Sequence, residues 1–189
     1  MFYDDCSSDR TSDYELLSTT AFYNQISTFS YDSTNHCYNL STGGAVDKNY
    51  GIAVKNLNVG SCKITAKVQV NSTQNVQIGA GLHNNSDTTV QIVSRILKIN
   101  NTTSIIRVDP DTTITSKNQT INTDTWYTLE FTNDNGSLTY ELYDSNGTLL
   151  KTLTGTTNLL SASNNTPFVF FSYSSNKNGK FKELKVEAL

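Results

Sequence analysis

Three neighbouring segments in the second half of the chain alternate hydrophobic and polar residues with a period of two. Such a period sends alternate side chains to opposite faces of a β-strand, so that one face is buried and the other is exposed. Asn135-Gly136 and Asn146-Gly147 separate the segments, and Asn-Gly favours a tight hairpin because both central residues of a type I′ turn need positive φ. The pattern therefore predicts an antiparallel meander. Its strands are expected at Trp126–Thr132, Leu138–Tyr143 and Leu149–Leu153.

The same kind of pattern continues through the rest of the chain. Ser61–Val70 is its clearest example, because an isoleucine, an alanine and two valines occupy every second position. Phe168–Tyr173 is instead apolar almost throughout, which is typical of a central strand. Gly, Asn, Ser and Pro residues separate the segments, and none has the period of a helix. The remaining predicted strands are Met1–Asp5, Tyr14–Leu17, Ala21–Phe29, Cys37–Leu40, Tyr50–Val54, Val76–Leu82, Val90–Ile99, Ser104–Val108 and Phe181–Leu189.

The number and spacing of these strands indicate the fold class. Many short strands with Gly and Asn turns predict an all-β protein, an antiparallel two-sheet β-sandwich of the jelly-roll type. The chain has 189 residues, an ordinary length for one sandwich with a sizeable core. No internal repeat or linker divides it, so we expect a single domain over residues 1–189.

The chain is weakly charged. Its formal net charge is -3 and 16% of its residues are charged, so it has no basic surface that would hold a phosphate backbone. We therefore expect no nucleic-acid partner. No apolar run approaches the ~18 residues that cross a bilayer, so we also expect no membrane insertion. The polar residues are mostly Asn, Ser and Thr, a composition common in surface and extracellular β-proteins.

Three cysteines, Cys6, Cys37 and Cys62, occur without a Cys-x-x-Cys pair. An odd number excludes a fully paired intramolecular set, and three small buried apolar residues are the simplest interpretation. A disulfide between Cys6 and Cys37 is the alternative in an oxidising compartment. The start, Met1–Asp5, lacks the basic residues and apolar core of a signal peptide. We expect either an intracellularly made protein, such as a virion subunit, or an excised module with an added Met1.

The order of four sequence pieces resembles a known pattern. They are Asp4–Ser7, where the family usually has Phe in place of Cys6, then Tyr38–Leu40, then Trp126–Leu129 with the two Asn-Gly hairpins, and the closing Phe181–Val186. In this order the chain resembles concanavalin A-like or laminin-G-like jelly rolls over nearly its whole length. These motifs are core and turn patterns, so the resemblance implies a fold and no specific activity.

That superfamily includes lectins, carbohydrate-binding modules, glycoside hydrolases and receptor-binding or adhesin domains of cell surfaces and viruses. The resemblance therefore implies an extracellular, cell-surface or virion location. The Asn/Thr-rich composition also resembles surface proteins of methanogenic archaea and archaeal viruses.

The acidic residues and histidines do not indicate a hydrolase. Hydrolases of this superfamily carry a Glu-x-Asp-x-x-Glu strand, because retaining hydrolysis needs two carboxyl groups roughly 5 to 5.5 Å apart, and this sequence lacks that pattern. Glu130 and Glu141 are expected to face one another across the hairpin as solvated charges. His36 adjoins Cys37, but neighbouring strand residues point to opposite faces, so they form no dyad. Both His36 and His83 are expected at the surface, and we predict that the chain is not an enzyme.

Calcium is the cofactor that the sequence leaves open. Turn carboxylates and amides supply the oxygen ligands that Ca²⁺ prefers. No Asp-x-Asp-x-Asp-Gly loop with a distal Glu is present, and turn chemistry accounts equally well for the Asp/Asn hairpins. Asp4 and Asp5 are candidates by analogy with family members. The metal candidates are Asp4, Asp5, Asp109 and Asp111, with Asp134, Asn135, Asp144 and Asn146 as turn alternatives.

Sugar binding usually combines an aromatic ring, which stacks on the apolar face of a pyranose, with polar groups that hold its hydroxyls. Trp126 and Tyr143 are large aromatic residues on the predicted exposed face of the meander, beside Glu141. Tyr173 and His83 are expected at strand ends, where loops gather. Trp126, the single tryptophan, has the alternative role of packing under a loop. These five residues are the candidate ligand-binding residues.

The sequence thus predicts a non-catalytic module that binds a glycan or another cell-surface polymer, within an adhesin, a viral tail or a capsid-decorating assembly. Weak recognition at one site would gain strength from many copies. The alternative is a structural virion or cell-surface subunit that contacts other virion or surface-layer protomers and binds no sugar. An open groove lined by aromatic residues would favour the first function. An apolar patch shared across a symmetric contact would favour the second.

Overall fold

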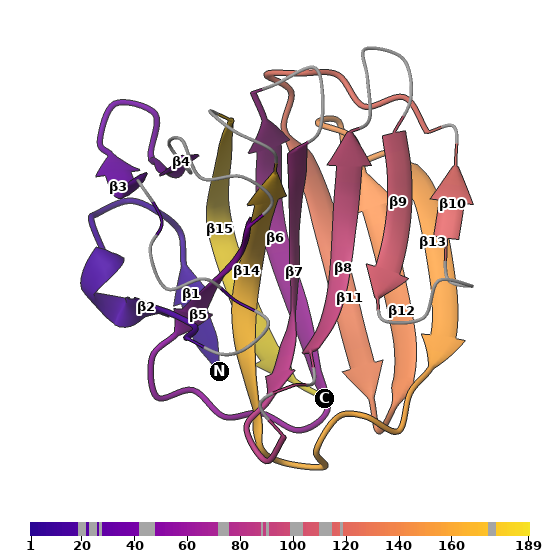
Figure 1. Cartoon of the computed structure of the whole chain (residues 1–189). Helices are drawn as coiled ribbons and strands as arrows, with labels where there is room; N and C mark the ends of the chain where they lie inside the picture. The colour runs from indigo at the N-terminus through magenta and orange to yellow at the C-terminus, as the bar shows by residue number, and fades with distance from the viewer. Residues whose placement is uncertain are drawn as a thin grey trace.

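The computed structural model describes residues 1–18, 22, 26, 28–41, 48–71, 76–87, 89, 91–98, 104–109, 115–117, 119–173 and 177–189. Within these residues the chain forms fifteen β-strands, one short 3₁₀-helix (Thr11–Asp13) and no α-helix. The strands form two antiparallel sheets that lie face to face, here called sheet A and sheet B (Figure 1). The predicted all-β sandwich is confirmed.

Each sheet is described from one edge to the other. Sheet A contains β13 (Leu149–Thr156), β12 (Ser137–Tyr143), β11 (Tyr127–Asp134), β6 (Cys62–Val70), β15 (Asn178–Ala188), β4 (Cys37–Ser41) and β3 (Thr28–Asp32), and β1 (Phe2–Asp4) also pairs with β15. Sheet B contains β10 (Thr115–Lys117), β9 (Ser104–Asp109), β8 (Gln91–Lys98), β7 (Val76–Asn84), β14 (Asn165–Tyr173), β5 (Lys48–Val54) and β2 (Tyr14–Leu16).

The predicted meander is present as β11, β12 and β13. Asn135 and Gly136 have φ of 47° and 89°, as a type I′ turn requires. The second turn differs from the prediction, because Gly147 has positive φ (80°) but the asparagine before it does not. There the Oδ1 of Asp144 accepts hydrogen bonds from the backbone N–H groups two and four residues later, at 2.9 and 2.8 Å. The carboxylate therefore shapes a longer turn than the tight hairpin that the sequence predicted.

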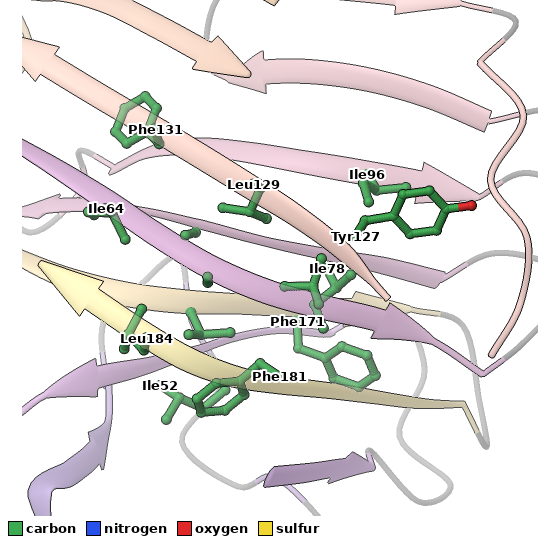
Figure 2. Close-up of a cluster of buried hydrophobic side chains, with 14 of the residues drawn as sticks. Ile52, Ile64, Ile78, Ile96, Tyr127, Leu129, Phe131, Phe171, Phe181 and Leu184 are labelled. Carbon is green, nitrogen blue, oxygen red and sulfur yellow. The ribbon is translucent and has the colours of Figure 1, made fainter. Parts of the chain in front are cut away.

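The main hydrophobic core lies between the two sheets. In β11 every second residue is buried, and the register pairs Phe131 with Ile64 and Leu129 with Ala66 on β6. Figure 2 shows side chains from both sheets pointing toward one another across the space between the layers. Burial of each large apolar side chain of this kind stabilises the fold by about 1.5–3 kcal/mol.

Cys6 lies where β15 departs from the predicted alternation. The register of β15 with β6 shifts between Lys182 and Lys185, and Glu183 has φ of 53°, which together mark a β-bulge. The backbone N–H of Glu183 donates to Cys6 Sγ at 3.4 Å, so the cysteine fills the bulge. Burial raises the pKa of the Cys6 thiol to about 12. All three cysteines are buried free thiols, which confirms the simplest interpretation of their sequence pattern.

Most strands begin and end within a few residues of their predicted positions, but β10 was not predicted, β3 begins only where the predicted segment Ala21–Phe29 ends, and one further difference matters for function. β7 extends to Asn84, so His83 lies inside a strand instead of in a polar turn. Most of the predicted segment Ala21–Phe29 lies outside the described residues. In the described part of the chain, no helix has the length and apolar character needed to span a bilayer.

Candidate functional site

Charged and hydroxyl side chains cover the outer face of sheet A and pair with one another. Lys63 Nζ lies 2.6 Å from Glu130 Oε2, and Lys67 Nζ lies 2.6 Å from Glu183 Oε2. Glu130 lies directly opposite Glu141, as the sequence predicted, and the Lys63 ammonium offsets the repulsion between the carboxylates. The outer face of sheet A is defined here by Lys63, Thr65, Lys67, Thr128, Glu130, Thr132, Thr139, Glu141, Tyr143, Lys180, Lys182, Glu183, Lys185 and Glu187.

Three of the predicted ligand-binding residues come together beside this face. The hydroxyl of Tyr143 donates to Glu141 Oε2 at 2.9 Å, and desolvation together with this hydrogen bond raises the pKa of Tyr143 to about 12. Trp126 immediately precedes β11 and is half-buried. Lys182 Nζ lies 4.6 Å from the centroid of its ring, which is within cation–π range. Tyr143 pairs with Thr128, two residues beyond Trp126, so both aromatic residues lie at this face, with Tyr143 on β12 and Trp126 toward Lys182 of β15.

A cavity of about 480 Å³ lies at the end of sheet A, on the side where β11 begins. Asn71 connects it to the segment before Trp126, because its Nδ2 donates to Asp124 Oδ1 and, at 3.1 Å, to Gln69 Oε1. Asn71 Oδ1 is buried and has no hydrogen-bond partner. The residues that line the cavity are Thr28, Asn39, Leu40, Ser41, Asn71, Asn178, Gly179 and Lys180.

The outer face of sheet B differs, because a second buried apolar cluster covers part of it. Its rings pack edge to face, with 5.1 Å between the ring centroids of Phe22 and Phe168. Phe168 and Phe170 alternate with the core residues Val169 and Phe171, so β14 is buried on both faces, which accounts for its nearly continuous apolar sequence. The members of this outer cluster are Leu17, Phe22, Ala53, Val93, Phe168 and Phe170.

Polar side chains on β7 and β8 border the outer cluster. Gln77 and His83 of β7, and Gln91 and Arg95 of β8, alternate with core residues, so they lie on the outer face of sheet B. The Arg95 Cζ lies 5.3 Å from the ring centroid of Phe170 on β14. The Oε1 atoms of Gln77 and Gln91 are buried and have no hydrogen-bond partner. The two glutamines lie about 20 Å apart along the strands.

Two glycines lie between these polar residues. An added Cβ would be 1.9 Å from the Ser94 carbonyl oxygen at Gly79, and 2.1 Å from the Ile92 carbonyl oxygen at Gly81. The close approach of the β8 backbone therefore requires glycine at both positions, which leaves β7 without side chains between Gln77 and His83. We call this surface the β7–β8 strip. It consists of Gln77, Gly79, Gly81, His83, Gln91 and Arg95.

The two remaining predicted ligand-binding residues belong to sheet B. His83 is 3% exposed, so its expected place at the surface was wrong. The longer β7 pairs His83 with Thr166 and Gln91, and its ring centroid lies 6.4 Å from that of Phe22. Tyr173 is the last residue of β14, and its side chain is outside the described part. Neither residue lies on the sheet that carries Trp126.

Asp4, the first metal candidate, is fully buried. Its Oδ2 accepts hydrogen bonds from the hydroxyls of Tyr14 (2.8 Å) and Tyr38 (2.7 Å), and its Oδ1 accepts one from the Cys6 backbone N–H (2.8 Å). Burial, together with the neighbouring carboxylate, raises the pKa of both tyrosines. Asp4 therefore ties β1 to β2 and β4.

The other metal candidates are Asp5, Asp109 and Asp111. Asp5 is exposed and accepts a hydrogen bond from the Ser7 backbone N–H at 3.0 Å, which lowers the pKa of Asp5. Asp109 ends β9, but its side chain and all of Asp111 lie outside the described residues. The described residues contain no cluster of three or more His, Cys, Asp or Glu side chains that would hold a metal ion.

A smaller cavity of about 290 Å³ lies beside the β11–β12 turn, at the opposite end of β11 from Trp126. The Asn133 amide there bonds to the protein backbone. Its Nδ2 donates to the Gly60 carbonyl at 3.3 Å, and its Oδ1 accepts from the Gly136 N–H at 3.0 Å. This amide holds the turn in place, so the smaller cavity is a weaker candidate than the β7–β8 strip.

Comparisons with known proteins confirm the fold. A family model described as "SO2946-like, C-terminal domain" matches residues 41–181. No curated protein matches the sequence. A seed lectin of Lotus tetragonolobus superposes with a TM-score of 0.69 at 9% identity, over 98% of this chain and 96% of the lectin.

Two further solved structures also superpose on this chain. The CBM2 module of the evolved Dit of Lactobacillus casei BL23 phage J-1 superposes with a TM-score of 0.66 at 13% identity, covering 98% and 93% of the two chains. An alginate lyase from Corynebacterium sp. superposes with a TM-score of 0.61 at 11% identity, covering 98% of each. The concanavalin A-like jelly roll expected from the sequence is thereby confirmed, and it is a fold that both binding proteins and enzymes use.

Proposed function

The chain belongs to the SO2946-like C-terminal domain family, and on that premise we propose that it is a non-catalytic carbohydrate-binding domain. All 189 residues act as one domain in this proposal. The ligand is an oligosaccharide whose hydroxyls reach the two half-buried glutamines at the ends of the β7–β8 strip, Gln77 and Gln91, while Gly79, Gly81 and His83 between them are buried. A lectin and a phage carbohydrate-binding module with the same fold support this class of function.

The observation that carries the proposal is the pair of unbonded amide oxygens on the β7–β8 strip. A buried polar atom without a hydrogen bond costs about 1–3 kcal/mol, so such atoms are uncommon unless something else satisfies them. Gln77 and Gln91 each present one, beside apolar residues that exclude water. Sugar hydroxyls are donors of the kind these oxygens lack.

The surroundings of the strip suit a binding site. Ligand sites are mostly apolar surfaces with a few placed polar groups. Beside the strip, Phe168, Phe170 and Val93 are buried, with 1–3% of their surface exposed, and the half-buried Arg95 places its guanidinium group above the Phe170 ring. The two glycines keep the strip free of further β7 side chains.

The carboxylates support a non-catalytic role. Glu130 and Glu141 are the only glutamates that lie directly opposite one another among the described strand pairs. Glu130 is bound to Lys63 and Glu141 to the Tyr143 hydroxyl, so both are held in side-chain pairs on the opposite sheet from the strip. A retaining glycosidase would need two carboxyl groups about 5 to 5.5 Å apart around the bound sugar.

The biological setting that we propose is an adhesin, a viral tail or a capsid-decorating assembly at a cell surface or virion. The likeness to a module of a phage Dit supports a viral setting. In such an assembly many copies act together, and tethering raises the apparent affinity by about 10² to 10⁴ over one site. A single isolated domain would then bind only weakly.

A glycan array probed with the domain on a multivalent scaffold tests the function. We expect binding to a defined set of oligosaccharides, and we expect it to be lost in the double variant Gln77→Leu/Gln91→Leu. Thr132→Val, which changes a half-buried polar residue on the outer face of sheet A, is the matched control and should bind like the unmodified domain. A blank array, or equal binding by the double variant, would contradict the proposal.

One observation favours the alternative of a structural subunit. β13 forms an edge of sheet A over eight residues, and Leu149 at its start is 49% exposed. An unpaired edge of this length is a template for pairing with another chain. Light scattering with and without EDTA separates the two functions, because a discrete assembly would favour the subunit and a monomer would favour the binding domain.

A further inference from the structure

The cavity at the end of sheet A lies on the opposite side of the sandwich from the β7–β8 strip. Its volume of about 480 Å³ is within the range of sites for small molecules. Amide, hydroxyl and ammonium groups from β3, β4 and β15, and from the segment that follows β6, line it. We infer that this cavity is a second binding site, which takes a saccharide that carries a carboxylate.

Lys180 supplies the preference for an anion. The other lysines around it are engaged, because Lys67 and Lys185 each pair with a glutamate and Lys182 lies over the Trp126 ring. Lys180 lines the cavity and forms no ion pair with the described residues. A carboxylate in the cavity would complete a charge-assisted hydrogen bond with its ammonium group.

Asn71 supplies the preference for a hydroxyl donor. Its Nδ2 donates to Gln69 Oε1 and Asp124 Oδ1, and turning the amide over would place its oxygen against two other oxygens. The orientation of the amide is therefore fixed. Its Oδ1 is buried and has no partner, and a ligand hydroxyl that reached it from the cavity would supply the missing donor.

The neighbourhood of the cavity favours a sugar over a small inorganic anion. Asn39, Asn178 and Thr28 add polar lining groups that suit a ring with several hydroxyls. Trp126 is connected to the lining by two contacts, because Lys182 over its ring follows Lys180 by two residues on the same face of β15, and Asp124 accepts a hydrogen bond from Asn71. A single lysine binds phosphate weakly, because phosphate usually accepts hydrogen bonds from several donors at once.

Trp126 gives a direct readout, since it is the single tryptophan of the chain. We expect glucuronate to change its fluorescence in a saturable way, and glucose to bind at least about tenfold more weakly, because it lacks the charged partner for Lys180. Acetate and inorganic phosphate, used as anions without the sugar ring, should give no saturable change. An equal response to glucose, or saturation by phosphate at the same concentration, would overturn the inference.

Substitutions of Lys180 locate the site. Lys180→Gln should weaken glucuronate binding about tenfold, and Lys180→Arg, which keeps the charge, should restore most of it. Lys151→Gln removes a charge from the edge strand β13 and serves as the control, with no expected effect. Unchanged thermal unfolding of all three variants would show that the fold is intact. Full glucuronate binding by a folded Lys180→Gln variant would contradict the second site.

Two experiments distinguish a failure of the second-site proposal from a failure of the proposed function. The double variant Gln77→Leu/Gln91→Leu should keep its glucuronate response, because both glutamines lie on sheet B. Loss of the response in that variant would place glucuronate on the β7–β8 strip and overturn the second site alone. A glucuronate response that depends on Lys180, together with a blank glycan array, would support the second site and contradict the proposed strip.

Discussion

On the outer face of sheet A, Lys63 and Lys67 each meet a glutamate, whereas on the outer face of sheet B, Gln77 and Gln91 each keep an amide oxygen without a donor. On the first face, most of the charged side chains are paired with one another. On the second face, the two glutamine oxygens have no hydrogen-bond donor, and a buried aromatic cluster lies beside them. The proposed carbohydrate site therefore lies on the face with unbonded polar atoms, and the proposed second site lies at the end of sheet A around Lys180, outside the ion pairs of that face.

The two faces also differ in how much they contribute to the stability of the fold. Sheet A presents half-exposed pairs, and such pairs contribute little to stability in water. Sheet B carries Phe168 and Phe170 on its outer face with 1% and 2% of their surface exposed. Part of the apolar burial of the molecule therefore lies outside the space between the sheets.

The largest expected effect follows from this burial. Phe170→Ala should lower the free energy of unfolding by about 3–5 kcal/mol, because it leaves a cavity in the outer cluster and removes the ring beneath Arg95. Thr132→Ala on the outer face of sheet A should change it by no more than about 0.5 kcal/mol. Urea unfolding followed by fluorescence measures both. A loss below about 1 kcal/mol for Phe170→Ala would mean that the outer cluster is not packed as described.

The second effect concerns the two unbonded glutamine oxygens. Gln77→Leu/Gln91→Leu should leave stability unchanged or raise it by about 1–2 kcal/mol, because it removes buried acceptors that have no donor. The same urea titration measures the change. If the glutamines are structural, the double variant will instead unfold at lower urea concentration, and the contrast between the two faces will disappear.

A smaller effect is expected from the ion pairs of sheet A. A double-mutant cycle with Lys63→Gln and Glu130→Gln should give a coupling of about 0.2–1 kcal/mol that weakens as salt is added. Unfolding curves at low and high ionic strength measure this coupling. A coupling well above this range, or one insensitive to salt, would show that the pair is shielded from water.

The smallest expected effect is a loss of stability at alkaline pH, caused by Tyr143 on the outer face of sheet A. The pKa of Tyr143 is raised from its ordinary value of 10.0 to about 12, so an unfolded chain loses this proton at lower pH than the folded chain does. The stability contributed by Tyr143 is therefore fully present below pH 10 and is lost as the pH rises toward 12. Tyr143→Phe should make the alkaline fall in stability shallower. An identical pH profile for the variant would show that the Glu141 hydrogen bond does not persist in solution.

The sequence alone was sufficient for the meander and for most strands, because alternation and Asn-Gly turns are local properties. The second turn was predicted less well, since the Asp144 carboxylate competes for backbone N–H groups. The position of His83 was predicted wrongly because glycines weaken the alternation of hydrophobic and polar residues in β7. Pairing with β8 and β14 extends β7 past the predicted end, so that it includes His83.

The candidate sites were predicted less completely. The contact between Tyr143 and Glu141 could be expected because both lie on one face of a single strand. Asn71 and Lys180 come from distant parts of the sequence, and only the pairing of β6 with β15 brings them together. The glycines at 79 and 81 were the available sign of the β7–β8 strip, since a glycine within a strand often marks a close backbone approach.

The most direct test of the account is an NMR titration of the isotope-labelled domain with the oligosaccharide that binds best on the array. If the oligosaccharide binds at the β7–β8 strip, the backbone amide resonances of β7, β8 and β14 will change first, around Gln77, Gln91 and Arg95. Changes confined to the outer face of sheet A or to the β11–β12 turn would contradict the assignment of the carbohydrate site to sheet B.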